Sequence, residues 1–339
     1  MRNNGSLAAC TPYYFHEVTE HPVVGVVMAA YNAAPFISEA ILSVVDQEFA
    51  DFVCCIVDDG SQDGTSDIAR RLTADDHRFK VIDQAHGGGS SARNLGVSQL
   101  PPTKYLSFPD ADDVWHNGAL RTLVEAASAL GGAGAHALGD QIDAQGRPYR
   151  PGSFIELGRD RFVSKHLRRY SVPLDRPSKF ESLVHSCTVY PPGLWLLSRS
   201  VFELAGGFDN WFQNFEDWDL VIRSSRFGDF AFVNEAIVDY RAHPAQASTN
   251  PVSHKYFNSV LAKSLKSPLN TPSQRKAVLS AWRTQEWGHA VEQLRRSVEE
   301  PKVALKSAPR AGLCLFRCVA GPIKIPVPPD RAAGEATTR

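Results

Sequence analysis

The sequence lacks the compositional biases that would assign a protein to a class directly. Its 36 lysines and arginines nearly balance its 37 aspartates and glutamates, so the formal net charge is −1. Such a balance gives no indication of a nucleic-acid or anionic-membrane partner. With 339 residues, 43% of them hydrophobic, the chain can form one large or two modest domains with a substantial core.

Cysteine is scarce, and the six cysteines are scattered. Cys54 and Cys55 lie within an apolar run, where cysteine behaves as a small hydrophobic residue. Cys314 and Cys318 lack the second ligand pair that a zinc site needs, so zinc is the less favoured interpretation. We therefore expect a reduced, cytoplasmic protein.

Long apolar runs are missing as well. No basic segment followed by an apolar stretch opens the chain, so no signal peptide is expected. The most membrane-like segment, residues 311–327, is interrupted by charged residues and prolines and is too short to cross a bilayer comfortably. It is expected to pack on the domain, and peripheral contact with the inner face of the membrane is the alternative.

The most informative feature that is present is an acidic cluster after a short apolar stretch. It consists of Asp110, Asp112 and Asp113. Carboxylates so close together repel one another, and a hard cation or a polar ligand would compensate them. The alternative is that they end a strand and cap the next helix, which Asp does well. The cluster alone leaves both interpretations open.

A second acidic junction favours the ligand-binding interpretation. Residues 52–57 form an apolar run typical of a buried parallel strand, and they lead directly into Asp58 and Asp59. In open α/β sheets, ligands bind at the edge where the carboxyl ends of the strands lie. We therefore expect both acidic clusters at one edge of a sheet.

Strand and helix patterns alternate in the first part of the chain. Strands are expected at residues 23–30, 52–57 and 79–82, and helices at about 35–46 and 65–72. This order favours a parallel sheet with crossover helices.

A glycine-rich loop follows the third expected strand, at residues 84–96. A helix is expected to start near Ser91, with Arg93 in its first turn. Backbone amides there could approach an anion, with Arg93 as the counter-charge. The G-x-G-x-x-G spacing of dinucleotide-binding proteins is absent, which disfavours that class.

The whole chain divides into segments of different character. We expect a flexible leader at residues 1–21, one domain at 22–250, a helical extension at 251–326 and a disordered tail at 327–339. Within the domain, the alternation breaks down at residues 138–190, where a variable, partly extended insertion is expected. Its arginines are most simply a solvated face.

Five segments in this order resemble the family-two glycosyltransferases. They are Ala30 to Asn32, Val57 to Thr65, Ala92 to Gly96, Asp110 to Asp113, and Gly206 to Asp217. Each is weak alone, but the set is specific and covers about two thirds of the chain. The resemblance implies an α/β GT-A fold, with a mixed, mostly parallel central sheet flanked by helices and a helical C-terminal extension. One departure from the family pattern is His86 in the glycine-rich loop.

The resemblance implies a site for a nucleotide-sugar donor. The ring of Tyr31 and a carboxylate of the Asp58/Asp59 pair would hold the base. Arg93 would lie near the nucleotide, and Asp110 would lie near the ribose. A carboxylate accepts the imino N–H of uracil, which mildly favours a UDP-sugar, although guanine carries an imino N–H too. The residues implied are Ala30, Tyr31, Asp58, Asp59, Arg93 and Asp110.

The resemblance also implies a metal and a general base. Asp112, in a DXD motif, would bind a divalent Mn²⁺ or Mg²⁺ ion that offsets charge on the leaving diphosphate. His243 is either a further ligand or a polar surface residue. Asp217 would take the proton of a hydroxyl acceptor. One base opposite the leaving group implies a single displacement with inversion at the anomeric carbon.

Three residues are assigned to the acceptor side. Glu216 neighbours the proposed base, and Trp211 could offer a flat face to a sugar. For Trp218, packing in the core is slightly preferred over contact with an acceptor. The implied activity is sugar transfer to a saccharide, lipid-linked or small-molecule hydroxyl, as in bacterial polysaccharide, glycolipid or natural-product biosynthesis.

Two other classes are weighed against this enzyme. A non-catalytic nucleotide-sugar or glycan-binding protein could share the fold, but it would have no use for the base Asp217. A nucleotidyltransferase would need a basic, glycine-rich phosphate loop near the N-terminus, where this chain has residues 31–34, Tyr-Asn-Ala-Ala.

Overall fold

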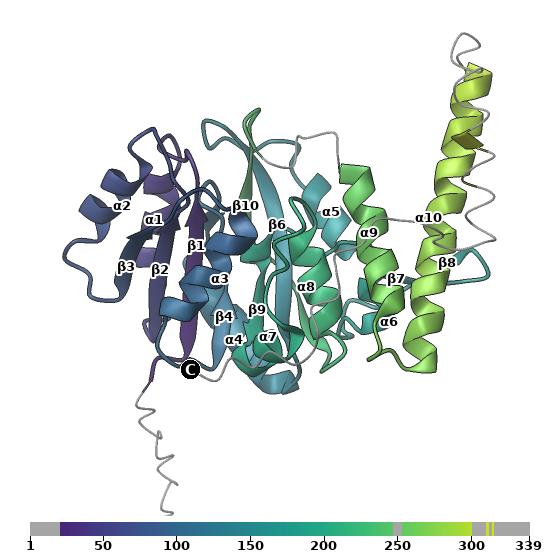
Figure 1. The fold of residues 1–339 in the computed structure, drawn as a ribbon, viewed down its shortest axis with the longest axis horizontal. Helices are drawn as coiled ribbons and strands as arrows, with labels where there is room; N and C mark the ends of the chain where they lie inside the picture. The colour runs from purple at the N-terminus through teal and green to yellow at the C-terminus, as the bar shows by residue number, and fades with distance from the viewer. Residues whose placement is uncertain (1–20, 247–252, 300–309, 312–313, 315–339) are drawn as a thin grey trace, which may run out of the picture.

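The computed structural model describes residues 21–246 and 253–299, together with residues 310, 311 and 314 (Figure 1). In this part of the chain, one eight-stranded sheet has the strand order β3-β2-β1-β4-β9-β6-β10-β5. Nearly all of the expected leader and the whole tail at 327–339 lie outside the described residues. Within the segment 311–327, only residues 311 and 314 are described.

The first half of the sheet is the predicted parallel unit. Its strands are β1 (Val24–Ala30), β2 (Phe52–Asp58), β3 (Phe79–Asp83) and β4 (Tyr105–Ser107). They pair in parallel, and the register places Ala30 opposite Asp58 at the carboxyl edge. The connecting helices are α1 (Ile37–Val45), α2 (Thr65–Thr73) and α3 (Gly89–Gln99). Strands β1 and β2 are continuous apolar runs that are buried over nearly their whole length, which accounts for the agreement with the sequence there.

The second half of the sheet makes it mixed. Its strands are β5 (Val114–Trp115), β6 (Gly134–Asp143), β9 (Trp195–Ser198) and β10 (Phe230–Ala242). Strand β9 runs antiparallel to both β4 and β6, while β10 runs parallel to β6 and antiparallel to β5. The sheet is therefore mixed and mostly parallel, as the resemblance implied.

Helices cover both faces of the sheet and bury two apolar clusters. Helices α1, α2 and α4 (Ala119–Leu130) contribute to one cluster. Helices α3, α7 (Arg199–Ala205) and α8 (Glu216–Ser224) contribute to the other. Trp115 lies in the first cluster and Trp195 in the second.

The expected insertion at residues 138–190 is only partly separate from the sheet. The first residues of this segment belong to β6, whose small residues lack the sequence pattern that is typical of a strand. They are small because the backbone of β9 passes close by: a side chain at Gly134 would meet the carbonyl of Leu196. The remaining residues form α5 (Ser153–Arg159), η1 (Pro192–Leu194) just beyond, a hairpin of β7 (Phe162–Lys165) and β8 (Arg168–Ser171), and α6 (Phe180–Leu183).

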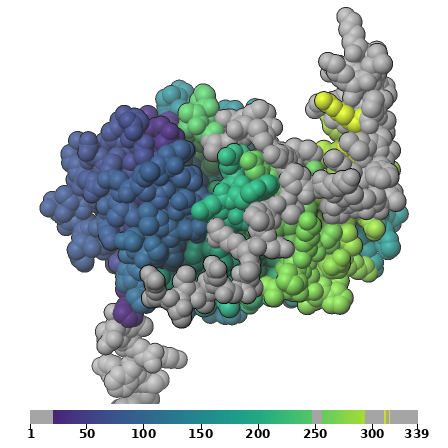
Figure 2. All heavy atoms as spheres, in the orientation of Figure 1, coloured from purple at the N-terminus to yellow at the C-terminus, as the bar shows by residue number. Residues whose placement is uncertain are grey.

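Two helices extend the domain on the side away from β3, so the chain passes from one end of the molecule to the other (Figure 2). They are α9 (Ser253–Lys266) and α10 (Pro272–Glu299). A third apolar cluster joins them to α6 and α8 and includes Trp218, Tyr256 and Trp282. No helix in the described ranges is long and apolar enough to cross a membrane.

Candidate active site

A cavity of about 950 Å³ opens at the carboxyl edge of the parallel strands. Many of the residues singled out from the sequence meet in its wall, although they lie far apart along the chain. Those that line it are Tyr31, Asp59, Arg93, Asp110, Asp112, Glu216, Asp217 and His243. Ala30, Asp58, Trp211 and Trp218 are not among the lining residues.

Asp59 braces the glycine-rich loop. Its two carboxylate oxygens accept the N–H groups of Gly87 and Gly88, each at 2.8 Å, and Oδ1 also accepts Nε2 of Gln84 at 2.6 Å. The Nδ1 atom of His86 lies 2.9 Å from Oδ2 of Asp59. The carboxylate therefore fixes the loop that precedes α3, a task that the sequence did not reveal.

Asp58 differs from its neighbour. The side chain is buried, and Oδ2 accepts the N–H of Ser61 at 3.0 Å. Its Oδ1 atom is buried without a hydrogen-bond partner among the described residues. A buried acceptor without a donor is costly, and a ligand donor would satisfy it.

Tyr31 and His86 form a stacked pair at the cavity wall. Their ring centroids lie 4.2 Å apart with an interplanar angle of 28°. Both residues line the cavity, and Tyr31 is half exposed. The pair offers a flat aromatic surface suited to a nucleobase. In the sequence, His86 stood out only as a departure from the family pattern and was not a candidate site residue.

The three aspartates of the acidic cluster come together in space. Their ligand atoms all lie within 4.8 Å of one another. The Nε2 atom of His243, at the end of β10, lies 2.9 Å from Oδ2 of Asp112. Sequence reasoning had left open whether His243 joins the aspartates, and the antiparallel pairing of β10 with β5, the strand that follows the cluster, places it there.

Asp113 points into the sheet. Its Oδ1 atom accepts the N–H of Arg241 at 2.9 Å, while Oδ2 is buried without a hydrogen-bond partner in the described part of the chain. Burial, with the neighbouring carboxylates of Asp112 and Asp110, raises the pKa of Asp113 well above its usual value. Crowded carboxylate oxygens, one unpartnered oxygen and an imidazole nitrogen fit a divalent cation.

Arg93 connects the acidic cluster to α8. Its Nη2 atom donates to Oδ1 of Asp110 at 2.7 Å, and its Nη1 atom donates to Oε1 of Glu216 at 2.9 Å. Burial opposes the charge of Arg93, but the two carboxylates raise its pKa above the usual value. Burial also raises the pKa of Asp110 to about 6, although Arg93 acts against this shift.

Asp217 occupies the first turn of α8 and is buried at the cavity wall. Its Oδ1 atom accepts the N–H of Trp218 at 2.7 Å. Burial, reinforced by the neighbouring charge of Glu216, raises the pKa of Asp217 to about 7. A carboxylate that titrates near neutral pH is a suitable general base.

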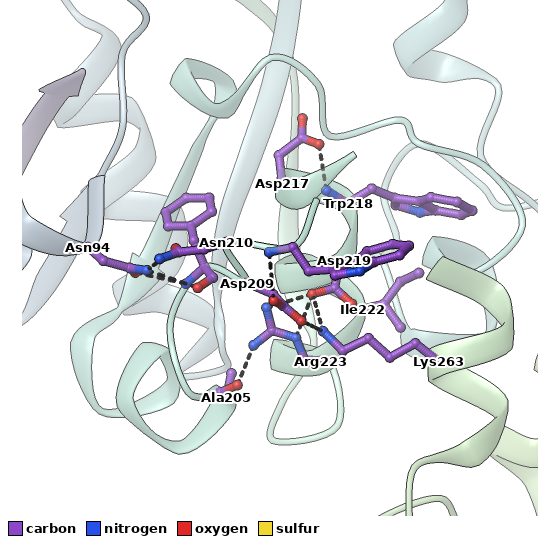
Figure 3. Close-up of polar contacts among 12 residues, drawn as sticks. Asn94, Ala205, Asp209, Asn210, Asp217, Trp218, Asp219, Ile222, Arg223 and Lys263 are labelled. Carbon is purple, nitrogen blue, oxygen red and sulfur yellow. Dashed lines mark hydrogen bonds and ion pairs between the residues drawn. The ribbon is translucent and has the colours of Figure 1, made fainter. Parts of the chain in front are cut away.

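A polar network below Asp217 fixes α8 in place. Lys263 of α9 donates to Oδ2 of Asp209 and to Oδ2 of Asp219, each at 2.8 Å, and Arg223 donates to the latter atom from Nε at 2.8 Å. Figure 3 shows these side chains gathered together while the carboxylate of Asp217 points away from them. The network leaves Asp217 outside its ion pairs.

Asn94, next to Arg93 on α3, anchors the loop that leads to α8. Its side chain donates to the carbonyl of Phe208 and accepts the N–H of the same residue, each at 2.9 Å. Phe215, immediately before the helix, has a φ of 63°, a conformation uncommon for a bulky residue. These contacts determine where Glu216 and Asp217 lie.

The two tryptophans that were assigned to the acceptor side lie in different environments. Trp218 is fully buried, its Nε1 atom donates to the carbonyl of Leu183 at 2.6 Å, and its ring packs on Phe257. It is a core residue and cannot face an acceptor. Trp211 is half-buried and packs edge-on against Tyr256, away from the cavity lining.

Several lining residues were not singled out from the sequence. They are apolar or polar side chains without an acidic or glycine-rich pattern, and no local signal distinguishes them from the core. The set includes Phe36, Cys187, Tyr190, Phe215, Tyr240 and Gln246.

Comparison with known proteins defines the class. Residues 25–205, more than half of the chain, match the family described as glycosyl transferase family 2. The chain belongs to this family. It is 30% identical over 237 residues to EpsJ of Bacillus subtilis, an uncharacterized glycosyltransferase, and the match spans 68% of this chain and 64% of EpsJ.

Solved structures share the fold of this chain. The TarS fragment 1–349 from S. aureus, in complex with UDP-GlcNAc, has a TM-score of 0.61 and 15% identity, covering 88% of this chain and 81% of that one. The mannosyltransferase PcManGT from Pyrobaculum calidifontis, in complex with GDP-Man and Mn²⁺, has a TM-score of 0.59 and 16% identity, covering 89% and 76%. The fold is therefore a GT-A glycosyltransferase fold.

Proposed function

We propose that this chain transfers a sugar from a UDP-sugar to a hydroxyl acceptor with inversion at the anomeric carbon. The observation that carries this proposal is that Asp112, paired with His243, and Asp217 line one cavity. Arg93 bridges the two sides through Asp110 and Glu216. A nucleotide-sugar donor agrees with the complexes of the structural relatives, which hold UDP-GlcNAc in one case and GDP-Man in the other.

The base of the nucleotide would lie between the acidic end of β2 and the stacked rings of Tyr31 and His86. The Oδ1 atom of Asp58, which has no hydrogen-bond partner among the described residues, could accept an imino N–H there, because the oxygens of Asp59 already hold the glycine-rich loop. Uracil presents such a donor. This is the reason for favouring a UDP-sugar.

The acidic cluster would hold a divalent Mn²⁺ or Mg²⁺ ion through Asp112 and His243. The Oδ2 atom of Asp113, buried without a hydrogen-bond partner in the part of the chain that the structure describes, and the crowding of the three carboxylates support a cation there. When bound, the ion would offset the negative charge that develops on the leaving diphosphate.

Asp217 would act as the general base. Its carboxylate is kept out of the ion pairs of α8, and its pKa of about 7 lets it accept a proton near neutral pH. Glu216, held by Arg93, would orient the acceptor side of the cavity. A single base on that side is consistent with a single displacement and requires no nucleophile from the protein.

A donor screen tests the proposal. The full chain is incubated with Mn²⁺, a mixture of hydroxyl acceptors and one of several UDP-, GDP- or dTDP-sugars, and the released nucleoside diphosphate is measured. We expect release from at least one UDP-sugar, and release about 10²–10⁴-fold slower by Asp217→Asn. Tight binding of UDP-sugars without acceptor-dependent release would favour the non-catalytic alternative. Release from GDP-sugars alone would overturn the choice of nucleotide.

A further inference from the structure

The hairpin β7-β8 has an unusual tip. Its register pairs Lys165 with Arg168, so His166 and Leu167 form the two-residue turn. Both turn residues have positive φ, 52° and 62°. Such turns normally take Asn or Gly, because other side chains are strained in this conformation. Residues 165–170, here called the basic hairpin tip, are all exposed.

One face of the hairpin packs against the body of the protein. Ser164 lies on this face, where its carbonyl accepts the hydroxyl of Ser280 and its own hydroxyl contacts that of Thr284, each at 2.6 Å. Phe162 is buried on the same face, and Arg169 stacks on its ring. Because side chains alternate along a strand, Lys165, Arg168 and Tyr170 lie on the other face.

The outward face concentrates positive charge. Lys165 and Arg168 are directly opposite one another across the two strands, and like charges in that arrangement repel. Among the described residues, neither has an acidic partner, whereas Arg169 on the inward face is paired with Asp160. The chain as a whole is close to neutral, so this pair is a local feature. An anionic surface would relieve the repulsion.

Apolar and aromatic side chains accompany the charges. Leu167 at the turn is 42% exposed and Tyr170 is 50% exposed. Trp287 of α10 is 45% exposed and lies one helical turn beyond Thr284, which contacts the hairpin. Cationic residues mixed with Leu, Tyr and Trp are typical of segments that lie in the headgroup region of a bilayer.

We propose that the basic hairpin tip, with Trp287 beside it, is a docking surface for the face of an anionic lipid bilayer. Lys165 and Arg168 would contact lipid phosphates, and Leu167 would enter the boundary between headgroups and acyl chains. A water-soluble polyanion would satisfy the charges but would leave Leu167 exposed, which is why the bilayer is favoured. The surface is separate from the cavity and does not depend on the proposed function.

The test is co-sedimentation of the full chain with vesicles of phosphatidylcholine alone or mixed with phosphatidylglycerol, without donor or acceptor. We expect binding only to the mixed vesicles, weakening as salt rises. The double variant Lys165→Glu/Arg168→Glu should weaken it about 30-fold or more, from the usual contribution of each surface cation. Leu167→Asn should weaken it while retaining the fold, because Asn tolerates the left-handed conformation.

The matched control is Arg71→Glu/Lys80→Glu, which makes the same change of charge on exposed residues of α2 and β3, at the other end of the molecule (Figure 1). It should bind mixed vesicles like the unaltered chain, and unchanged melting temperatures would show that both double variants are folded. Equal binding by the two double variants would overturn the proposal. So would the absence of vesicle binding by the unaltered chain, or tip-dependent binding to an oligonucleotide or an acidic polysaccharide in its place.

Discussion

Arg93 and Glu216, 123 positions apart, are joined by a hydrogen bond of 2.9 Å from Nη1 to Oε1. The contact joins α3, which follows the glycine-rich loop, to the first turn of α8. The other arm of the guanidinium binds Asp110. One buried arginine thus determines the spacing between the acidic cluster and the segment that carries Asp217.

Replacing Arg93 should lower both stability and turnover. In Arg93→Gln the carboxylates of Asp110 and Glu216 lose their shared cation, and removing one partner of a buried ion pair costs about 3–5 kcal/mol. Arg93→Lys keeps the charge but not the two-armed geometry, so it should recover stability only in part. Urea unfolding measures the effect, and Arg93→Gln/Glu216→Gln should be more stable than Arg93→Gln. An unchanged unfolding midpoint in Arg93→Gln would contradict the bridging role.

Asp217→Asn should reduce turnover by about 10²–10⁴-fold, the usual contribution of a general base. Affinity for UDP should stay nearly constant, because Asp217 is assigned to the acceptor and not to the nucleotide. Glu216→Gln should have a milder effect on turnover. Steady-state kinetics and calorimetry separate the two quantities, and NMR of the product gives its anomeric configuration. Retention of the donor's configuration would rule out the single displacement.

The titration of Asp217 should be visible in stability as well. Its pKa of about 7 in the folded chain exceeds the value of about 3.9 in unfolded chains. The contribution of the protonated carboxyl is therefore complete below about pH 4 and is lost as pH rises to about 7. Asp217→Asn should be more stable than the unaltered, metal-free chain at pH 8, by up to about 4 kcal/mol, with little gain at pH 4. A gain equal at both pH values would argue against a buried, titrating carboxylate.

Metal should be required for activity. Excess EDTA should abolish transfer, and Mn²⁺ or Mg²⁺ should restore it. Without donor, the same ions should raise the melting temperature, because they bind only the folded cluster and relieve carboxylate repulsion. Asp112→Asn should remove this response, and His243→Ala should weaken it. Full activity in excess EDTA would exclude the metal assignment.

Asp58 and Asp59 should respond differently to the same replacement. Asp59→Asn should lower the melting temperature without any ligand, because an amide cannot accept both glycine N–H groups with its two terminal atoms. Asp58→Asn should mainly reduce the stabilisation that UDP gives in the presence of metal. Equal stabilisation of the unaltered chain by UDP and GDP would remove the reason for favouring a uridine donor.

The sequence by itself determined the first half of the sheet and the acidic edge of the site. Strands β1 and β2 are continuous apolar runs, and β3 is a short, mostly apolar segment. Each pattern lies within a few neighbouring residues, so the local sequence is enough to locate these strands. Asp58 ends β2, Asp59 follows it, and the aspartates at 110–113 come shortly after β4. Parallel pairing of β2 and β4 with β1 brings both groups to one edge. The helical C-terminal extension that the resemblance implied is present as α9 and α10.

Only the tertiary structure determines which of these side chains are buried or held by contacts within the protein. The strand β6 was missed because its small residues are selected by the backbone of β9, some 60 positions away, and not by local propensity. Asp58 and Asp59 differ in role because the glycine-rich loop packs against Asp59, whose carboxylate accepts two N–H groups of that loop. Trp218 became a core residue because α9 covers it. Burial and hydrogen-bond partners depend on contacts between segments that are distant in the sequence. Such contacts cannot be predicted from local sequence patterns.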